Sequence, residues 1–195
     1  MDNDRIQHYM RRLSSLEQER KSWESHWREL SAMFLPRRAR FLNAGGRTNE
    51  GKKGDANLVD STGILSARTL ASGMQSGLTS PARPWFRLTL QDASAAEANE
   101  AKAWLHAVQE VLVNAFARSN FYDGVHLLYH ELGVFGTGCL LVEEDADSTL
   151  RCRALTVGEY CVDTDASGRV DTLYRRIAMT ARQILDAWPD SCPER

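Results

Sequence analysis

The chain has 195 residues, with 24 Lys and Arg against 26 Asp and Glu, and its formal net charge is −2 at pH 7. This balance excludes an acidic disordered tail and a uniformly basic nucleic-acid coat, and 43% hydrophobic residues suffice for a buried core. The length fits one domain, or one domain with a helical appendage. Any contact with nucleic acid is therefore expected to be local.

The two ends and the cysteines give further expectations. The opening MDNDRIQHYMRR is charged and lacks an apolar run, so we expect no signal peptide, and no later stretch has the length of a membrane span. We therefore expect synthesis in the cytoplasm. The final DAWPDSCPER adds no core element, which indicates a chain truncated at its C-terminus. The cysteines form no CxxC pair and fit neither a zinc site nor a dense disulfide framework, so reduced thiols are expected at Cys139, Cys152, Cys161 and Cys192.

The first predicted element is one long amphipathic helix from residue 4 to 34, ended by Pro36. Apolar residues recur through it at helical spacing with charges between them. At 1.5 Å per residue this helix would be roughly 45 Å long, which is longer than a small domain needs. Its apolar stripe therefore needs a neighbour to cover it.

A basic, glycine-rich loop follows over residues 36–57, and we place a domain boundary after residue 58. Its cations face water, a nucleic-acid backbone or an acidic neighbour: Arg37, Arg38, Arg40, Arg47, Lys52 and Lys53. Gly46, Gly51 and Lys52 also match GxxxxGK, the front of a phosphate-binding loop. That alternative, a nucleotide-binding enzyme, lacks both the hydroxyl that would hold Mg²⁺ and the preceding strand.

The stretch SGMQSGLTSPARPWFRL connects a predicted helix over 60–78, capped by Asp60 or Ser61, to a predicted strand, WFRLTL. Gly77 is expected to end the helix in a left-handed conformation, and Pro81 prevents its continuation. Trp85 and Phe86 could stack on a base or an apolar ligand, but the alternation also suits burial on one face of a strand. We interpret the stretch as a rigid helix-to-strand joint made by Gly73, Gly77, Pro81, Pro84 and Trp85.

The rest of the chain predicts two more helices, over 97–119 and 121–134, then strands between 137 and 179. A short helix over 181–188, capped by Thr180, closes the pattern. Helices followed by antiparallel strands define an α+β fold, with a domain over 59–195 after the long helix and its loop.

No set of residues survives as a catalytic site. His126 and His130 have the spacing of a metal-binding pair, but Leu127 stands where a metalloprotease needs Glu, and no third ligand follows. The glycines of VFGTGCLL precede a strand, so a tight reversal with positive φ or close packing explains them better than a dinucleotide turn. Cys139 lacks a recognisable histidine partner. The acids at the EEDADS hairpin are typical turn residues: Glu143, Glu144, Asp145 and Asp147. We therefore expect no enzyme, cofactor or metal.

Four stretches together resemble a known family. They are LPRRARFL, DSTGILSARTLASGMQSGLTSPARPWFRL, FARSNFYDGVHLLYHELGVFGTGCLLVEED and GEYCVDTDASGRVDTLYRRIAMTARQI, in that order, over nearly all of residues 35–184. The pattern resembles the N-terminal part of the head-to-tail connector, or portal, proteins of short-tailed, T7-like bacteriophages and prophages. Two of these stretches are long and unusual, so chance similarity is improbable.

The resemblance implies a structural subunit with a wing-like α+β fold in a ring, typically of twelve subunits, at one capsid vertex. Double-stranded DNA would pass through the ring, and the partners would be terminase, head-tail adaptor and tail proteins, and capsid or scaffold proteins, with no membrane. Channel-lining and clip residues would lie beyond residue 195. A small head-tail adaptor is a further alternative, which the motif order disfavours. The candidates for packing between subunits are Trp23, Trp27, Leu30 and Met74.

Overall fold

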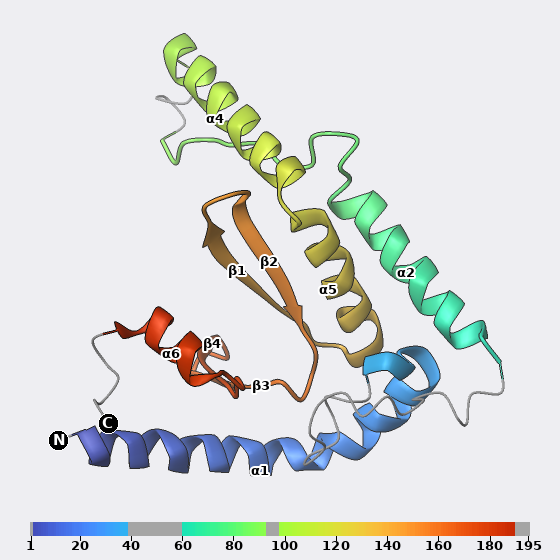
Figure 1. Cartoon of the computed structure of the whole chain (residues 1–195). Coiled ribbons are helices and arrows are strands. Elements are labelled where there is room, and N and C mark those ends of the chain that lie inside the picture. The colour runs from blue at the N-terminus through green and yellow to red at the C-terminus, as the bar shows by residue number, and fades with distance from the viewer. Residues whose placement is uncertain (1, 39–59, 93–97, 190–195) are drawn as a thin grey trace. The chain divides into compact units, whose positions relative to one another are not determined.

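The computed structural model describes residues 2–38, 60–92 and 98–189 (Figure 1). Its helices are α1 (Asp2–Phe34), α2 (Thr62–Leu78), α4 (Asn99–Arg118), α5 (Phe121–Phe135) and α6 (Ala181–Ala187). Its strands are β1 (Cys139–Asp145), β2 (Thr149–Leu155), β3 (Tyr160–Thr164) and β4 (Val170–Arg175). The predicted α+β fold is confirmed. In the described part, the strands pair as two separate antiparallel hairpins, β1–β2 and β3–β4.

Contacts along the backbone divide the chain into two compact units. The central unit is Lys21–Gly158, and the terminal unit combines Met1–Arg20 with Glu159–Arg195. This grouping differs from the predicted boundary after residue 58, because the N-terminal part of α1 packs with the last hairpin. The boundary after residue 58 stays a prediction.

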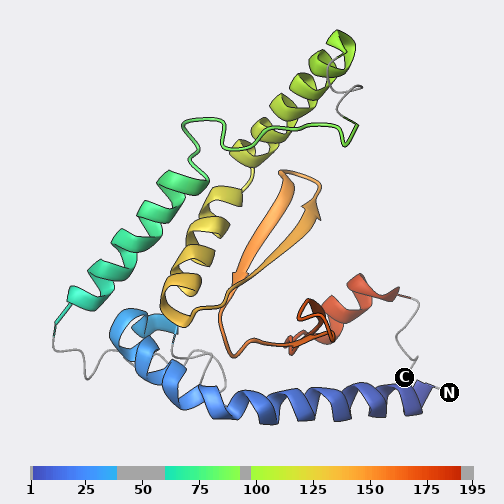
Figure 2. The ribbon, with the colours of Figure 1, turned by 180° about the vertical axis from the view of Figure 1, so that it is seen from behind.

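In the central unit, α5 lies between α2 and the β1–β2 hairpin (Figures 1 and 2). Small residues allow the two helices to approach: Ala71 packs with Val125 and Tyr129 of α5, with Met74, Phe121, Leu132 and Leu140 around them. On the hairpin side, a Cβ added at Gly124 would lie 2.8 Å from Cys152 Cβ, so a larger residue would push the helix and the hairpin apart. A second cluster joins Phe135 and Val157 to Trp27, Leu30, Leu35 and Val134.

The end of α5 confirms the predicted tight reversal. Gly136 is the C-cap with φ 74°, a left-handed conformation that favours glycine, and its N–H donates to the Leu132 carbonyl at 3.1 Å. A Cβ added at Gly138 would lie 2.6 Å from Leu128 Cδ1. One glycine therefore supplies positive φ and the other supplies close packing.

In the terminal unit, the first part of α1 packs on the β3–β4 hairpin through Leu13, Leu16, Cys161 and Tyr174. Arg176 binds the Glu17 carboxylate with two nitrogens, each 2.8 Å from an oxygen, and Arg12 pairs with Asp163. The predicted cap of α6 is confirmed: Thr180 and Gln183 form a reciprocal capping box.

Two local predictions about the joint after α2 are wrong. Gly77 lies inside α2 without positive φ, and the helix ends at its C-cap, Thr79, whose N–H donates to the Gln75 carbonyl. The segment WFRLTL is extended, but it has no strand partner among the described residues. The joint therefore connects a helix to an isolated extended segment.

Candidate functional site

The joint after α2 is held by side chains of α5 and by its own backbone. The Thr79 and Tyr129 hydroxyls are hydrogen-bonded at 3.1 Å in a buried position, and the Gln75 amide donates to the Tyr122 carbonyl at 3.0 Å. Arg83 donates to the Ser76 carbonyl at 3.3 Å. These bonds fix the direction in which the chain leaves α2.

Trp85 is the anchor of this joint. Its indole ring is stacked on Phe121 with an interplanar angle of 5° and on Phe116 with an angle of 23°, and Phe86 contacts both Trp85 and Phe116 edge-on. The indole N–H is 3.4 Å from the Tyr122 hydroxyl. Trp85 therefore belongs to an aromatic cluster with Phe86, Phe116 and Phe121, which favours the structural interpretation over stacking on a base.

The other residues assigned to the joint contribute less. A Cβ added at Gly73 or Gly77 would meet no atom within 4 Å, so neither glycine is required for packing within the described subunit. Pro81 and Pro84 are exposed, and their effect on the joint is to restrict its backbone.

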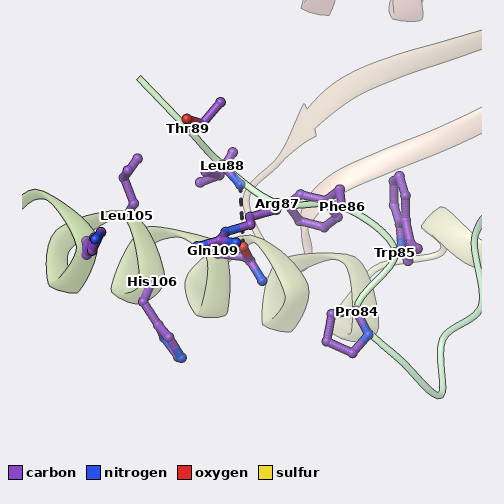
Figure 3. Close-up of a pocket in the computed structure, with 10 residues that line it drawn as sticks. Pro84, Trp85, Phe86, Arg87, Leu88, Thr89, Leu105, His106 and Gln109 are labelled. Carbon is purple, nitrogen blue, oxygen red and sulfur yellow. Dashed lines mark hydrogen bonds between the residues drawn. The ribbon is translucent and has the colours of Figure 1, made fainter. Parts of the chain in front are cut away.

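Beyond Trp85 the extended segment runs along α4 and forms a groove with it (Figure 3). The Leu88 N–H is 3.4 Å from the Gln109 Oε1, which ties the segment to the helix. The groove has a volume of about 920 Å³ and is lined by Pro84, Trp85, Phe86, Arg87, Leu88, Thr89, Lys102, Leu105, His106 and Gln109. Sequence reasoning missed it, because the alternation of WFRLTL carries no signal for its partner.

The predicted packing residues divide into two groups. Trp27, Leu30 and Met74 pack within the central unit. Trp23 is 58% exposed and makes a stacked contact with Trp27, with ring centroids 6.5 Å apart. Among these four predicted packing residues, Trp23 is thus the one with most of its apolar surface exposed to solvent in the described part of the chain.

The predicted basic cluster lies mostly outside the described residues, which include neither Arg40, Arg47, Lys52 and Lys53 nor the glycines of the GxxxxGK match. Arg37 is exposed. Arg38 is half-buried, and its Nη1 donates to the Thr156 hydroxyl at 2.6 Å and lies 3.5 Å from Glu131 Oε1. Arg38 therefore belongs to an internal network instead of a nucleic-acid surface.

Glu131 is the centre of that network, which the sequence analysis did not find. Its carboxylate is 1% exposed, and Oε1 accepts a hydrogen bond from the Thr156 hydroxyl at 3.0 Å. The sequence signal that could have revealed this network was Glu131 itself, a single acid in the apolar pattern of YHELGVF. The network ties α5 to the residues that follow α1 and β2.

His126 and His130 lie with ring centroids 4.9 Å apart, and the Nδ1 atom of each is buried without a hydrogen-bond partner. Burial lowers the pKa of His130, and His126, Arg38 and Arg68 lower it further by their charge. No group of three metal-ligating side chains occurs in the parts of the chain that the structure describes. A cationic surrounding disfavours a metal ion at this pair.

The acids of the β1–β2 turn serve the turn itself. Asp145 accepts hydrogen bonds from the Ser148 N–H at 2.9 Å and hydroxyl at 2.7 Å, which lower the pKa of its carboxyl group. Glu143 lies 3.9 Å from Arg153 across the hairpin. Asp145 is therefore not suited to donate a proton near neutral pH. Cys139, Cys152 and Cys161 form no disulfide with one another, and burial raises the pKa of the Cys152 thiol.

Comparison with known proteins identifies the family. The family model described as bacteriophage head to tail connecting protein matches residues 6–195. The chain belongs to this family. It is 44% identical over 174 residues to the probable portal protein of Bordetella phage BPP-1 and 39% identical over 176 residues to the portal protein of Salmonella phage epsilon15.

These matches cover 89% and 90% of this chain but 31% of each relative. The chain thus spans about a third of the length of the curated relatives it matches. The resemblance drawn from the sequence to phage connector and portal proteins is confirmed, whereas the phosphate-loop alternative gains no support. No helix in the described residues is long and apolar enough to cross a membrane.

Proposed function

We propose that the chain is part of a portal subunit, a structural protein of a ring at one capsid vertex through which DNA is packaged and ejected. The observation that carries this proposal is the match of residues 6–195 to the connector family, together with two relatives named portal proteins. The geometry supports a structural role, because the described side chains form packing clusters and hydrogen-bonded turns.

The partners follow from this proposal. The ring would consist of copies of the subunit, typically twelve, with double-stranded DNA in its channel. Terminase, head-tail adaptor and tail proteins, and capsid or scaffold proteins would dock on it. The described α+β fold would form the peripheral wing. Its assembly would take place in the host cytoplasm before the virion is complete.

Immunogold labelling tests the position in the virion. An antibody raised against the 195-residue chain should mark a single vertex of each phage particle in electron micrographs, at the head-to-tail junction. Labelling spread over the whole head, or confined to the distal tail, would contradict the portal assignment. An antibody against the major capsid protein provides the control for accessibility.

The basic loop carries a narrower proposal: Arg37, Arg40, Arg47, Lys52 and Lys53 contact DNA or an acidic neighbouring subunit. Arg38 is left out because Thr156 and Glu131 bind it. Fluorescence titration with duplex DNA should show binding at low ionic strength that weakens steeply with salt. Absence of binding at low salt would exclude DNA as the contact of this loop.

A further inference from the structure

The extended segment after the joint has the properties of a strand that lacks a partner. Along residues 86–90, Phe86, Leu88 and Leu90 are half-buried while Arg87 and Thr89 are exposed, the period-two alternation of a strand. The Leu88 N–H points to Gln109. Neighbouring residues of an extended chain direct their backbone N–H and C=O groups to opposite edges. The backbone groups of Arg87 and Thr89 therefore lie on the edge away from Gln109. Within the described residues, no hydrogen bond is made to these backbone groups.

The segment carries one exposed cation, Arg87, whose backbone groups lie on the open edge. Lys102 and His106 line the groove on the other edge, where the Leu88 N–H meets Gln109. Trp85 and Phe86 contact the rings of Phe116 and Phe121, which anchors the start of the segment. An extended acidic strand fits the open edge, because it would pair with the free backbone groups and meet Arg87.

The chain itself carries a strand of this kind, β1. Figures 1 and 2 both place β2 between β1 and α5, so the outer edge of β1 faces away from the helix. The outer edge of β2 is occupied: the Asn120 amide donates to the Cys152 carbonyl at 2.8 Å and accepts from its N–H at 2.7 Å. The edge of β1 is thus the open one in this hairpin.

The register of the hairpin shows which groups β1 presents. Cys152 lies opposite Val142. The N–H and C=O groups of Cys152 point away from β1, towards Asn120, so Cys152 and Val142 are a non-hydrogen-bonded pair. The N–H and C=O groups of Val142 therefore point away from β2, at the outer edge of β1. Glu144, two residues on, presents its backbone at the same edge, and its carboxylate is exposed.

We propose that β1 of a second copy of this chain adds as an antiparallel strand to the segment from Trp85 to Leu90. The second copy's Glu144 lies opposite Arg87 and its Val142 opposite Thr89, so that residues with open backbone groups face one another and the charges match. The contact joins two different surfaces of the chain, which is the kind of contact from which rings are built. This inference rests on the proposed function, because the second copy is a neighbouring subunit of the proposed ring.

Charge reversal with mixing tests the pairing in the 195-residue chain. Arg87→Glu alone and Glu144→Lys alone should each weaken self-association, measured by sedimentation velocity, by about tenfold in Kd, because an attraction becomes a repulsion. An equimolar mixture of the two variants should recover the wild-type association, since residue 87 of each copy then meets a residue 144 of opposite charge in alternating copies. Unchanged thermal unfolding of both variants controls for folding.

Three results would overturn the inference: a single variant that associates as well as the wild type, a mixture that does not recover, or a wild-type chain that stays monomeric at the highest soluble concentration. None of these bears on the immunogold position of the protein in the virion. Failure of the strand contact and failure of the portal assignment are therefore distinguishable.

Cross-linking tests the register. Paired residues in such a strand contact have Cα atoms about 5.5 Å apart, within the range that a disulfide spans. A chain with both Thr89→Cys and Val142→Cys should form covalent dimers and longer ladders on mild oxidation, resolved on non-reducing gels. Each single variant is the control for the native cysteines. A double variant that cross-links no more than the controls would overturn the proposed register.

Discussion

Helices α4 and α5 follow one another with only Ser119 and Asn120 between them, yet they use their apolar residues differently. In α5, Gly124, Val125, Tyr129, Glu131 and Phe135 are buried between α2 and the first hairpin. In α4 no residue is buried, and Trp104 and Val111 are 61% and 67% exposed. Helical periodicity thus predicts which face of a helix is apolar, but it does not show whether the same chain covers that face.

The difference extends to the polar residues. In α5 a carboxylate is enclosed with an arginine and a threonine, whereas in α4 Glu110 forms an exposed pair with His106 at 3.8 Å. Buried ionic groups lose much free energy when one partner is removed, while exposed pairs contribute little. We therefore expect equivalent substitutions to destabilise the fold in α5 and to be tolerated in α4.

The largest effect is expected from Glu131→Ala. Removal of the carboxylate leaves Arg38 and the Thr156 hydroxyl without their buried partner, which should reduce the free energy of unfolding by about 3 kcal/mol. Urea unfolding followed by circular dichroism measures this change. Glu110→Ala in α4 is the matched control, expected within about 0.5 kcal/mol of the wild type. Equal effects at the two positions would refute the contrast between the helices.

A second, smaller effect is expected from Gly124→Ala. The added Cβ would meet Cys152 Cβ at 2.8 Å and Leu140 Cδ1 at 3.3 Å, and the strain should exceed the gain in helix propensity. We expect a net loss of about 1 to 2 kcal/mol. Gly73→Ala, inside α2 with no atom within 4 Å of the new Cβ, should instead stabilise the fold by about 0.5 to 1 kcal/mol. A stabilising Gly124→Ala would show that the hairpin can move away from α5.

Local signals in the sequence predicted the elements well. Thr180 in front of ARQILDAW predicted a capped helix, and the glycines of VFGTGCLL predicted the reversal at Gly136. Each of these features is settled by a few neighbouring residues. The error at Gly77 is instructive, because several small residues near the end of α2 could have ended it, and the helix continues to Leu78.

Features that depend on distant residues could not be predicted. The alternation of WFRLTL arises because one side of the segment packs on α4, and the same alternation would be seen in a strand with a partner. The network of Glu131, Arg38 and Thr156 joins positions far apart in the chain, so the sequence offered only the lone acid in an apolar helix face. The groove was missed for the same reason.

The third prediction concerns pH. The pKa of His130 lies below its ordinary 6.5, first because of burial and then because of the charges of His126, Arg38 and Arg68. The unfolded chain therefore takes up this proton at a higher pH than the folded chain does. The associated stability is fully present above pH 6.5 and is lost as the pH falls below it towards the folded pKa.

His130→Gln should accordingly make urea unfolding midpoints depend less on pH below pH 6.5. His106→Gln on the exposed face of α4 is the matched substitution, which controls for the loss of an imidazole in general. If His130→Gln leaves the pH dependence of the unfolding midpoint unchanged, protonation of His130 does not destabilise the folded state.

The smallest effect on folding is expected from Trp104→Ala in α4. The indole is 61% exposed, so its removal should change the free energy of unfolding by no more than about 0.5 kcal/mol, against the 3 to 5 kcal/mol typical of a buried tryptophan. Trp27→Ala, within the cluster of Phe135 and Val157, supplies the buried comparison. If Trp104→Ala leaves the unfolding midpoint unchanged but weakens self-association, the uncovered face of α4 serves assembly. If instead it destabilises the isolated chain as much as Trp27→Ala does, the contrast between α4 and α5 fails.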